Sequence, residues 1–458
     1  MKVIQVPFCF APDPMGGTEV YVGNLARDLQ TLGVEAVVAA SDQANREYIV
    51  DGLRVRRYAV TDKVTDLIQL YGAGDPLAAA EFAKLLDDEA PDLVHLHALT
   101  RGVSLRMVQA AKQRQIPVVF TYHTPTVSCQ RGTLMLWGED LCDGRLDVGR
   151  CAGCTLNGLG MHGPLADKVG RLPPALGRWL GDRGLQGGIW TALRMSELTR
   201  VRQAVFHKLM ADVDHVVAVC KWVQEIIISN NVPPAKVSLS HHGIKWDPTQ
   251  PSTPAPSLDP ETRHETRIAF VGRLDRTKGL HVLIAAFRAA PTMNARLDIY
   301  GIVQSPASAA YQQDMKSLAG SDSRISFCDP IPSGEVVSRL RHYDFLAVPS
   351  QWLETGPLVA LEAFAAGIPV IGWNLGGLTE LVRHDVNGLL IEPDAVSRWV
   401  ETLQRVANDA GLRARLKAGV RPPRSSTEVA HEMLALYKSL LKPDPTPLAE
   451  PAAVREIH

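Results

Sequence analysis

Two glutamates, Glu354 and Glu362, lie on either side of Gly356 and Pro357 in an otherwise largely apolar stretch. Because proline suits the first turn of a helix, a helix is expected to begin near Pro357. Glu354 then lies in the preceding loop, and Glu362 on the second helical turn. Their carboxylates can accept hydrogen bonds from ligand hydroxyls, while free N–H groups of the helix take a phosphate. In the alternative interpretation, one of the two glutamates caps the helix and the other is exposed to solvent.

A second anion site is indicated upstream of these glutamates. An apolar run ends at Gly272 and Arg273, and Lys278 opens the next helical pattern. Two cations beside a helix N-terminus favour an anion, and a diphosphate would fit there. Strand–turn–helix connections also carry glycine and surface cations by chance, so this segment alone leaves both interpretations open.

Four of the seven cysteines fall within 26 residues, namely Cys129, Cys142, Cys151 and Cys154. The two-residue gap between the last two lets both thiolates of one turn face a common centre. Four thiolates match a structural zinc site, although the spacing is looser than in a zinc ribbon. An iron–sulfur cluster, a pair of disulfides in an oxidising compartment and four unpaired thiols packed in a loop remain open.

Residues 168–208 combine cations with tryptophan and leucine. Eight Lys or Arg stand there against only Asp182 and Glu197, and Trp179 and Trp190 are interleaved with them. Such a composition suits an interfacial segment and predicts contact with an anionic membrane surface or an anionic acceptor. The alternative is an ordinary helical insertion whose tryptophans lie in the core.

The elements that must position these residues follow a repeating pattern. Short β-branched apolar runs, such as residues 34–40, 93–96 and 118–122, alternate with helical patterns, which predicts parallel sheets covered by helices. Residues 247–265 hold five prolines and break the pattern, so we expect a linker there. The alternation then restarts with six further strand-like runs. The predicted class is α/β, with two doubly wound domains and a ligand cleft between them.

The composition excludes several classes of protein. The chain has 458 residues, 46% of them apolar, which excludes wholesale disorder. Its formal net charge of −1 argues against nucleic acid as a partner. No run of 18 apolar residues occurs and the start lacks the features of a signal peptide, so a cytoplasmic location is expected.

Taken together, these segments resemble the retaining glycosyltransferases of family 4, which have the GT-B fold. The resemblance covers about residues 1–440 and rests on SQWLETGPLVALEAFAAGIPVIGWNLGGLTELV, on Gly272-Arg273 with Lys278, on HHGIK before the linker, and on Gly16-Gly17 with Glu19. It implies an acceptor domain at 1–246, with the Cys-rich and basic insertion at about 124–212, and a donor domain at 266–424. A closing helix at 425–441 would pack back on the first domain, followed by a disordered tail at 442–458.

The resemblance also implies roles for single residues. Arg273 and Lys278 would hold the diphosphate of a nucleotide-sugar donor, Glu362 the ribose and Glu354 the donor sugar. His123, at the end of the run 118–122, would hydrogen-bond the sugar or acceptor; His95 and His97 are weaker candidates. The other expected donor-binding residues are Gly17, Gly272, Ile331, Thr355, Gly356, Pro357 and Leu358. Because fixed cations can neutralise the leaving diphosphate, no metal cofactor is expected for catalysis.

The function implied is retaining transfer of a sugar to an acceptor hydroxyl, in bacterial-type polysaccharide or glycolipid synthesis. The partners would be a nucleotide-sugar donor, a glycan or glycolipid acceptor and the anionic inner face of a membrane. Two alternatives remain: a non-catalytic GT-B scaffold of a polysaccharide assembly complex and a GT-B-like sugar-nucleotide epimerase. The presence of Arg273, Lys278, Glu354 and Glu362 together favours the transferase.

Overall fold

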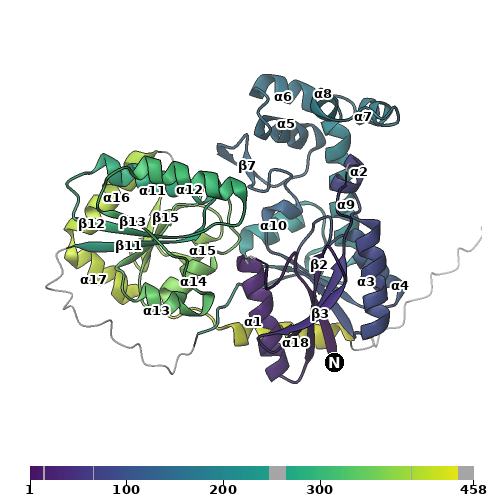
Figure 1. Ribbon diagram of the computed structural model, residues 1–458, viewed down its shortest axis with the longest axis horizontal. Helices are drawn as coiled ribbons and strands as arrows, with labels where there is room; N and C mark the ends of the chain where they lie inside the picture. Colours follow the sequence, from purple (N-terminus) through teal and green to yellow (C-terminus); the bar gives the residue numbers. More distant parts are fainter. Residues whose placement is uncertain (14–15, 65, 247–264, 394, 442–458) are drawn as a thin grey trace, which may run out of the picture.

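The computed structural model describes residues 1–13, 16–64, 66–246, 265–393 and 395–441 (Figure 1). Two β-sheets, each flanked by helices, occupy different parts of the molecule. This is the predicted α/β arrangement of two Rossmann-like, doubly wound domains. The expected linker at 247–265, except its last residue, and the expected tail at 442–458 lie outside the described residues.

The first sheet has eight strands in the order β10-β9-β6-β5-β1-β2-β4-β3, and all neighbours are parallel except the edge pair β3 and β4. The strands are β1 (Lys2–Val6), β2 (Glu35–Asp42), β3 (Arg46–Val50), β4 (Leu53–Ala59), β5 (Leu93–Leu96), β6 (Val118–Tyr122), β9 (His215–Ala218) and β10 (Val237–Leu239). The helices of this domain are α1 (Gly17–Thr31), α2 (Leu67–Tyr71), α3 (Pro76–Glu89), α4 (Leu105–Gln113) and α10 (Lys221–Ser229). Central strands such as β6 are buried at every residue, because helices cover both faces of the sheet.

An insertion lies between β6 and β9. Its elements are η1 (Pro125–Val127), β7 (Met135–Leu136), β8 (Asp140–Leu141), α5 (Val148–Gly158), α6 (Gly163–Gly170), α7 (Pro174–Gly181), α8 (Gly188–Leu193) and α9 (Met195–Asp212). Helix α9 packs against α4, α5 and α7 and so joins the insertion to the first domain. We call residues 159–193 the outer lobe; Figure 1 shows its helices α6, α7 and α8 along the upper edge of the molecule.

The second sheet is entirely parallel, with the order β13-β12-β11-β14-β15-β16. Its strands are β11 (Thr266–Arg273), β12 (Ala295–Ile302), β13 (Ile325–Cys328), β14 (Phe345–Val348), β15 (Val370–Trp373) and β16 (Gly388–Ile391). Its helices are η3 (Arg276–Lys278), α11 (Leu280–Ala289), α12 (Pro306–Ala319), η4 (Ser333–Glu335), α13 (Val336–Leu340), α14 (Leu358–Ala365), α15 (Leu378–Leu381), α16 (Val396–Asn408) and α17 (Ala410–Gly419). All six strand-like runs expected after the linker form strands.

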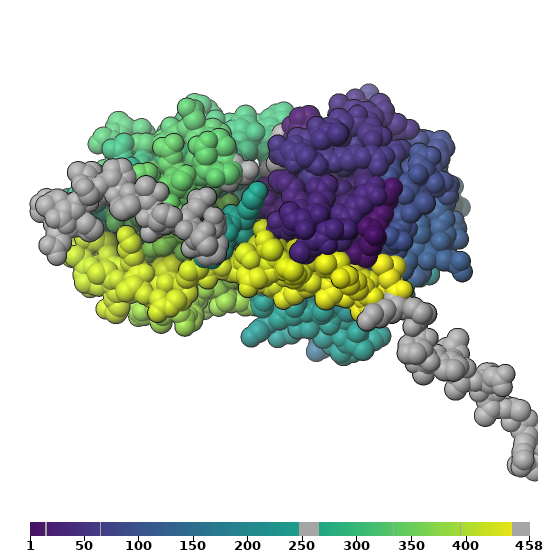
Figure 2. All heavy atoms as spheres, turned by 90° about the horizontal axis from the view of Figure 1, so that it is seen from below, coloured from purple at the N-terminus to yellow at the C-terminus, as the bar shows by residue number. Residues whose placement is uncertain are grey.

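The closing helix α18 (Ser426–Leu441) packs against α1 of the first domain. Val429, Met433 and Tyr437 on one helical face are buried there in a cluster with Val22 and Leu25. Figure 2 shows this helix, in yellow, running beneath the purple N-terminal segment. The chain therefore crosses from the second domain back to the first.

Candidate functional site

The two domains touch where strands of both sheets end. Thr355 Oγ1 of the second domain donates a hydrogen bond to the carbonyl of His123, which follows β6, at 2.6 Å. His242, after β10, lies 3.1 Å through Nδ1 from the carbonyl of Gly356. The fold therefore brings together the predicted residues His123, Thr355 and Gly356. His242 was not predicted; its one signal was its place in HHGIK.

The buried Glu354 and the partly exposed Lys278 form an ion pair with 2.7 Å between Nζ and Oε1. Ser350 also donates a short hydrogen bond to Glu354 Oε1. Burial raises the pKa of Glu354, but the charge of Lys278 and the hydrogen bonds from Lys278 and Ser350 outweigh it, so the pKa lies below its usual value. Glu354 is therefore ionised at neutral pH and can accept hydrogen bonds from ligand hydroxyls.

Local backbone geometry fixes the position of Lys278. The side chain of Asp275 caps the turn η3 by accepting a hydrogen bond from Thr277 N at 2.8 Å. Gly279 then takes a left-handed conformation with φ 71°, and a Cβ atom there would lie 1.8 Å from the carbonyl oxygen of Pro349. Only glycine allows this contact between the turn and the loop that carries Glu354.

Arg273 is the last residue of β11 and, unlike Lys278, is not paired with a glutamate of the described residues. No carboxylate of the residues that the structure describes lies within salt-bridge distance of Arg273. The start of α14 meets the start of α1: a Cβ atom on Gly17 would lie 3.7 Å from Leu358. Two helix N-termini thus meet beside the loop that carries Glu354, the partner of Lys278, and helix N-termini favour an anionic ligand. Pro357 is the N-cap of α14 rather than its first residue.

Glu362 lies on α14 without a partner. Its partly buried carboxylate makes no hydrogen bond or ion pair to any described side chain or backbone group. Burial raises the pKa of Glu362 to about 7. Ile331 follows β13 and packs at the edge of the neighbouring apolar cluster. Gly272 precedes Arg273 in β11, with only the tip of Phe270 within 4 Å of a Cβ position.

Three buried histidines form a chain from the first sheet to the second domain. His97 Nδ1 lies 3.0 Å from His123 Nε2, and His123 Nδ1 lies 3.3 Å from His242 Nε2. The chain continues to the Gly356 carbonyl, and at its other end His97 Nε2 lies 2.7 Å from Gln5 Oε1. Both ring nitrogens of His123 are thus engaged, so a ligand can bond to this ring only if one link opens.

Counting the N–H donors determines how the hydrogen bonds of this histidine chain are arranged. Burial lowers the pKa of His97 and His123 well below the usual value and that of His242 to about 4, so all three rings are neutral. Three neutral rings supply three N–H donors, but four links with an acceptor at each end need four. Turning the Gln5 amide so that its NH₂ faces His97 removes the conflict, and each histidine then carries its proton on Nδ1.

This tautomer assignment predicts the effect of a charge at position 5. In the parent protein, none of the three ring signals should titrate between about pH 5.5 and 8, as followed by NMR of labelled histidine. Gln5→Glu places an acceptor at that end, which favours one imidazolium and should raise the pKa of one ring into this range. Gln5→Met should leave all three rings neutral. A parent ring that titrates near pH 6.5 would contradict the assignment.

Glu380 is a further contact between the domains that was not predicted. Its carboxylate accepts hydrogen bonds from the backbone N–H groups of Lys221 at 2.9 Å and Trp222 at 3.4 Å, at the start of α10. It also lies 3.1 Å from His241 Nε2. Glu380 stands inside the LTELV end of the quoted segment, but only the fold shows which helix it meets.

Comparison with known proteins shows which family the chain belongs to. Residues 16–243 match the family described as Glycosyl transferase 4-like domain, and residues 259–421 match Glycosyl transferases group 1. The chain carries both domains of a glycosyltransferase. The D-inositol 3-phosphate glycosyltransferase of Corynebacterium glutamicum (strain R) is 38% identical over 158 residues, which make up 33% of this chain and 38% of that protein. The match thus spans well under half of this curated relative.

Two solved structures share the fold of this glycosyltransferase chain. Sucrose-phosphate synthase from Thermosynechococcus elongatus aligns with a TM-score of 0.63 and 19% identity, covering 96% of this chain and 99% of that one. HepE of Anabaena, in complex with UDP and glucose, aligns with a TM-score of 0.62 and 16% identity, covering 96% and 100%. The predicted GT-B fold is confirmed.

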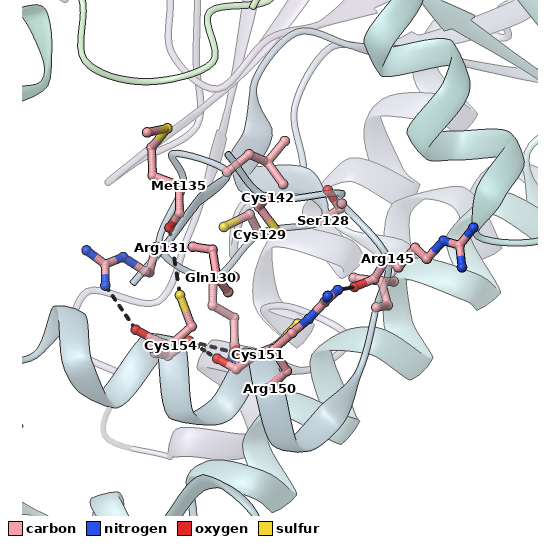
Figure 3. A pocket seen from close by; sticks show the side chains of 15 residues that line it. Ser128, Cys129, Gln130, Arg131, Met135, Cys142, Arg145, Arg150, Cys151 and Cys154 are labelled. Carbon is pink, nitrogen blue, oxygen red and sulfur yellow. Dashed lines mark hydrogen bonds between the residues drawn. The ribbon is translucent and has the colours of Figure 1, made fainter. Parts of the chain in front are cut away.

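The four cysteines of the glycosyltransferase insertion line one small cavity of about 30 Å³ (Figure 3). Cys129 and Cys142 come from the loops around the β7–β8 hairpin, and Cys151 and Cys154 from α5. Cys154 Sγ accepts a hydrogen bond from Trp137 N at 3.3 Å. As the side chains stand, the described residues include no group of three or more His, Cys, Asp or Glu arranged to hold a metal ion. The zinc site therefore stays a prediction.

Proposed function

We propose that this protein is a retaining glycosyltransferase that moves a sugar from a nucleoside-diphosphate donor to an acceptor hydroxyl. The observation that carries the proposal is the Lys278–Glu354 ion pair at the loop before α14, whose N-terminus meets that of α1. Arg273, without a carboxylate partner, and Lys278 would hold the diphosphate. The ionised Glu354 would accept hydrogen bonds from the donor sugar, and Glu362 from the ribose.

In the proposed reaction, the bond between the sugar C1 and the diphosphate oxygen breaks and the bonding electrons leave with the diphosphate. The acceptor oxygen bonds to C1 on the same face, and its proton passes to the leaving phosphate. Negative charge develops on the diphosphate, where Arg273, Lys278 and the helix N-termini stabilise it. His123 has both ring nitrogens occupied, so we assign it a positioning role through the chain to Gly356.

A structural neighbour supports a nucleotide-sugar donor, since the HepE structure holds UDP and glucose. We propose a glycan or glycolipid acceptor in polysaccharide or glycolipid synthesis on the cytoplasmic side of a membrane. No helix among the described residues is long and apolar enough to cross a membrane. A scaffold without activity and a sugar-nucleotide epimerase are the competing functions.

A panel of nucleotide sugars tests the proposal. The true donor should raise the melting temperature, because a ligand at 100 times its Kd stabilises the folded state by about 2.7 kcal/mol. It should also be cleaved slowly to nucleoside diphosphate and free sugar. Binding without cleavage, even with glycan acceptors, would favour the scaffold, and conversion to an epimeric sugar would favour the epimerase.

We also propose a structural zinc ion at the four cysteines. Its support is that four thiols from three separate segments line a cavity with room for one small ion. Binding would require the side chains to turn toward the centre of the cavity. Backbone N of Leu353, next to Glu354, donates to the carbonyl of Thr133 in the same loop system at 3.1 Å, so zinc would brace a loop that touches the donor site.

Metal analysis of protein purified without chelator should find about one equivalent of zinc. Cys151→Ser should lose the metal and lower the melting temperature, whereas Cys328→Ser, in the second domain, should retain it. Less than about a tenth of an equivalent, with all four thiols reactive in the folded protein, would contradict the zinc proposal. Iron with sulfide would instead indicate a cluster.

A further inference from the structure

The outer lobe concentrates exposed apolar side chains. Among the described residues, six of the eighteen exposed large hydrophobic side chains lie within this short segment: Leu159, Leu165, Leu176, Trp179, Ile189 and Trp190. Trp179 is 50% exposed, Trp190 38% and Ile189 69%. The alternative that these tryptophans lie in the core is therefore wrong for both of them. An apolar concentration of this kind marks a surface that contacts something.

The cations of the original segment divide into two groups. Arg194 is buried and pairs with Glu197 at 3.0 Å, and Arg202 donates to the carbonyl of Thr126 at 2.8 Å. These two hold the insertion together, which corrects the expectation that the whole basic segment faces a partner. The exposed cations of the segment are those of the outer lobe, together with Arg200 and Lys208 on α9.

Within the outer lobe, Lys168, Arg178 and Arg183 are exposed and have no described carboxylate within salt-bridge distance. Arg171 pairs with Asp167 at 3.0 Å on the surface. The lobe has four basic residues against two acidic ones, whereas the whole chain has 48 against 49. Positive charge and exposed apolar area thus occur together in this part of the molecule.

Helix α7 shows how the two properties share one face. Gly177 and Leu180 face α9, because a Cβ atom on Gly177 would lie 2.7 Å from Glu197 Cβ and Leu180 is buried. Leu176 and Trp179 lie on another face of α7 and are exposed, as is Arg183 just beyond the end of the helix. The guanidinium of Arg183 lies over the Trp179 ring, 3.7 Å from its centroid. The packing of α7 on α9 holds this face outward.

We propose that the outer lobe docks on the surface of a lipid bilayer that contains anionic lipid. Tryptophan, leucine and isoleucine would enter the headgroup region, and Lys168, Arg178 and Arg183 would lie against anionic headgroups. A soluble acidic protein would be attracted by the cations but offers no apolar layer for side chains on three separate helices. The proposal does not depend on the transfer reaction.

Co-sedimentation with vesicles tests the docking. The full chain should pellet with vesicles of phosphatidylcholine and phosphatidylglycerol, pellet much less with phosphatidylcholine alone, and be released by salt. Arg178→Glu with Arg183→Glu should lower the partition coefficient at least about 30-fold, since each cation near an anionic surface contributes about 1 kcal/mol. Trp179→Ser with Trp190→Ser should lower binding even at low salt.

The matched control is Lys417→Glu with Arg421→Glu, which makes the same charge change on the exposed surface of the second domain. It should bind anionic vesicles like the parent protein, and circular dichroism should show that all variants are folded. Equal pelleting with neutral and anionic vesicles, an absence of pelleting, or an equal loss of binding in the control would each overturn the proposal.

Discussion

Lys278→Ala is expected to lower kcat/KM for sugar transfer by about a thousandfold, the scale found when a charge-stabilising donor is removed from a reacting centre. The ammonium would be lost from the diphosphate, and Glu354 would lose its partner. The pKa of Glu354 should then rise, because burial, its largest influence, would be opposed only by the hydrogen bond from Ser350. Because this carboxyl must be ionised to act as an acceptor, the residual activity of the variant should rise with pH where that of the parent is flat.

Glu354→Gln should lower activity similarly, but without the new pH dependence. Combining it with Lys278→Ala should restore part of the stability lost in Lys278→Ala, since the double variant leaves no unpaired buried charge. Lys84→Ala, on the exposed surface of α3, is the control and should keep full activity. Near-parental turnover by Lys278→Ala or Glu354→Gln with the true donor would show that the paired-glutamate assignment is wrong.

Glu362→Gln is expected to affect stability and donor binding in opposite directions. A carboxyl whose pKa is raised from 4.5 to about 7 in the folded protein binds more protons when folded than when unfolded over that interval. Its contribution to stability therefore falls as the pH rises through the interval, and its ionisation opposes folding above pH 7. Without donor, the glutamine variant should melt at a higher temperature than the parent at pH 8 and at an equal temperature near pH 4.

Donor binding should change the other way, because the charged carboxylate is the stronger acceptor for ribose hydroxyls. We expect the Kd of the donor to rise about 10- to 100-fold in Glu362→Gln, as hydrogen bonds to charged groups contribute about 1.5–3 kcal/mol. Calorimetric titration at pH 8 measures this effect. Higher stability with unchanged donor affinity would show that Glu362 is merely an unpaired carboxylate and does not bind the ribose.

The local sequence could predict the elements of the fold that consist almost entirely of apolar residues. Buried parallel strands are apolar at nearly every position, so β6 and β14 were visible as short runs. The hairpin of β3 and β4 was not, because it is rich in charge: Arg57 is buried and pairs with Asp13 at 2.9 Å. From the sequence alone, a buried arginine cannot be distinguished from an exposed one, because its ion-pair partner is not known.

The histidine chain shows the same limit within the site. His123 could be predicted because it ends an apolar run, but its partner His242 lies 119 positions further along the chain. The other partners, Gln5 and Gly356, come from β1 and from the second domain. The surface of the outer lobe likewise could not be predicted without the tertiary structure. Only the structure shows that Trp179 is exposed and not in the core, and that Arg194 has an ion-pair partner whereas Arg178 has none among the described residues.

Retaining sugar transfer is the central claim, and early ¹H NMR spectra of donor cleavage test it most directly. With an α-linked nucleotide sugar and the purified full chain, the first sugar signal should be the α-anomer, before mutarotation mixes the two forms. The same configuration should persist in the glycoside formed with an added acceptor. Initial release of the β-anomer, or no cleavage of any nucleotide sugar that binds, would contradict the claim.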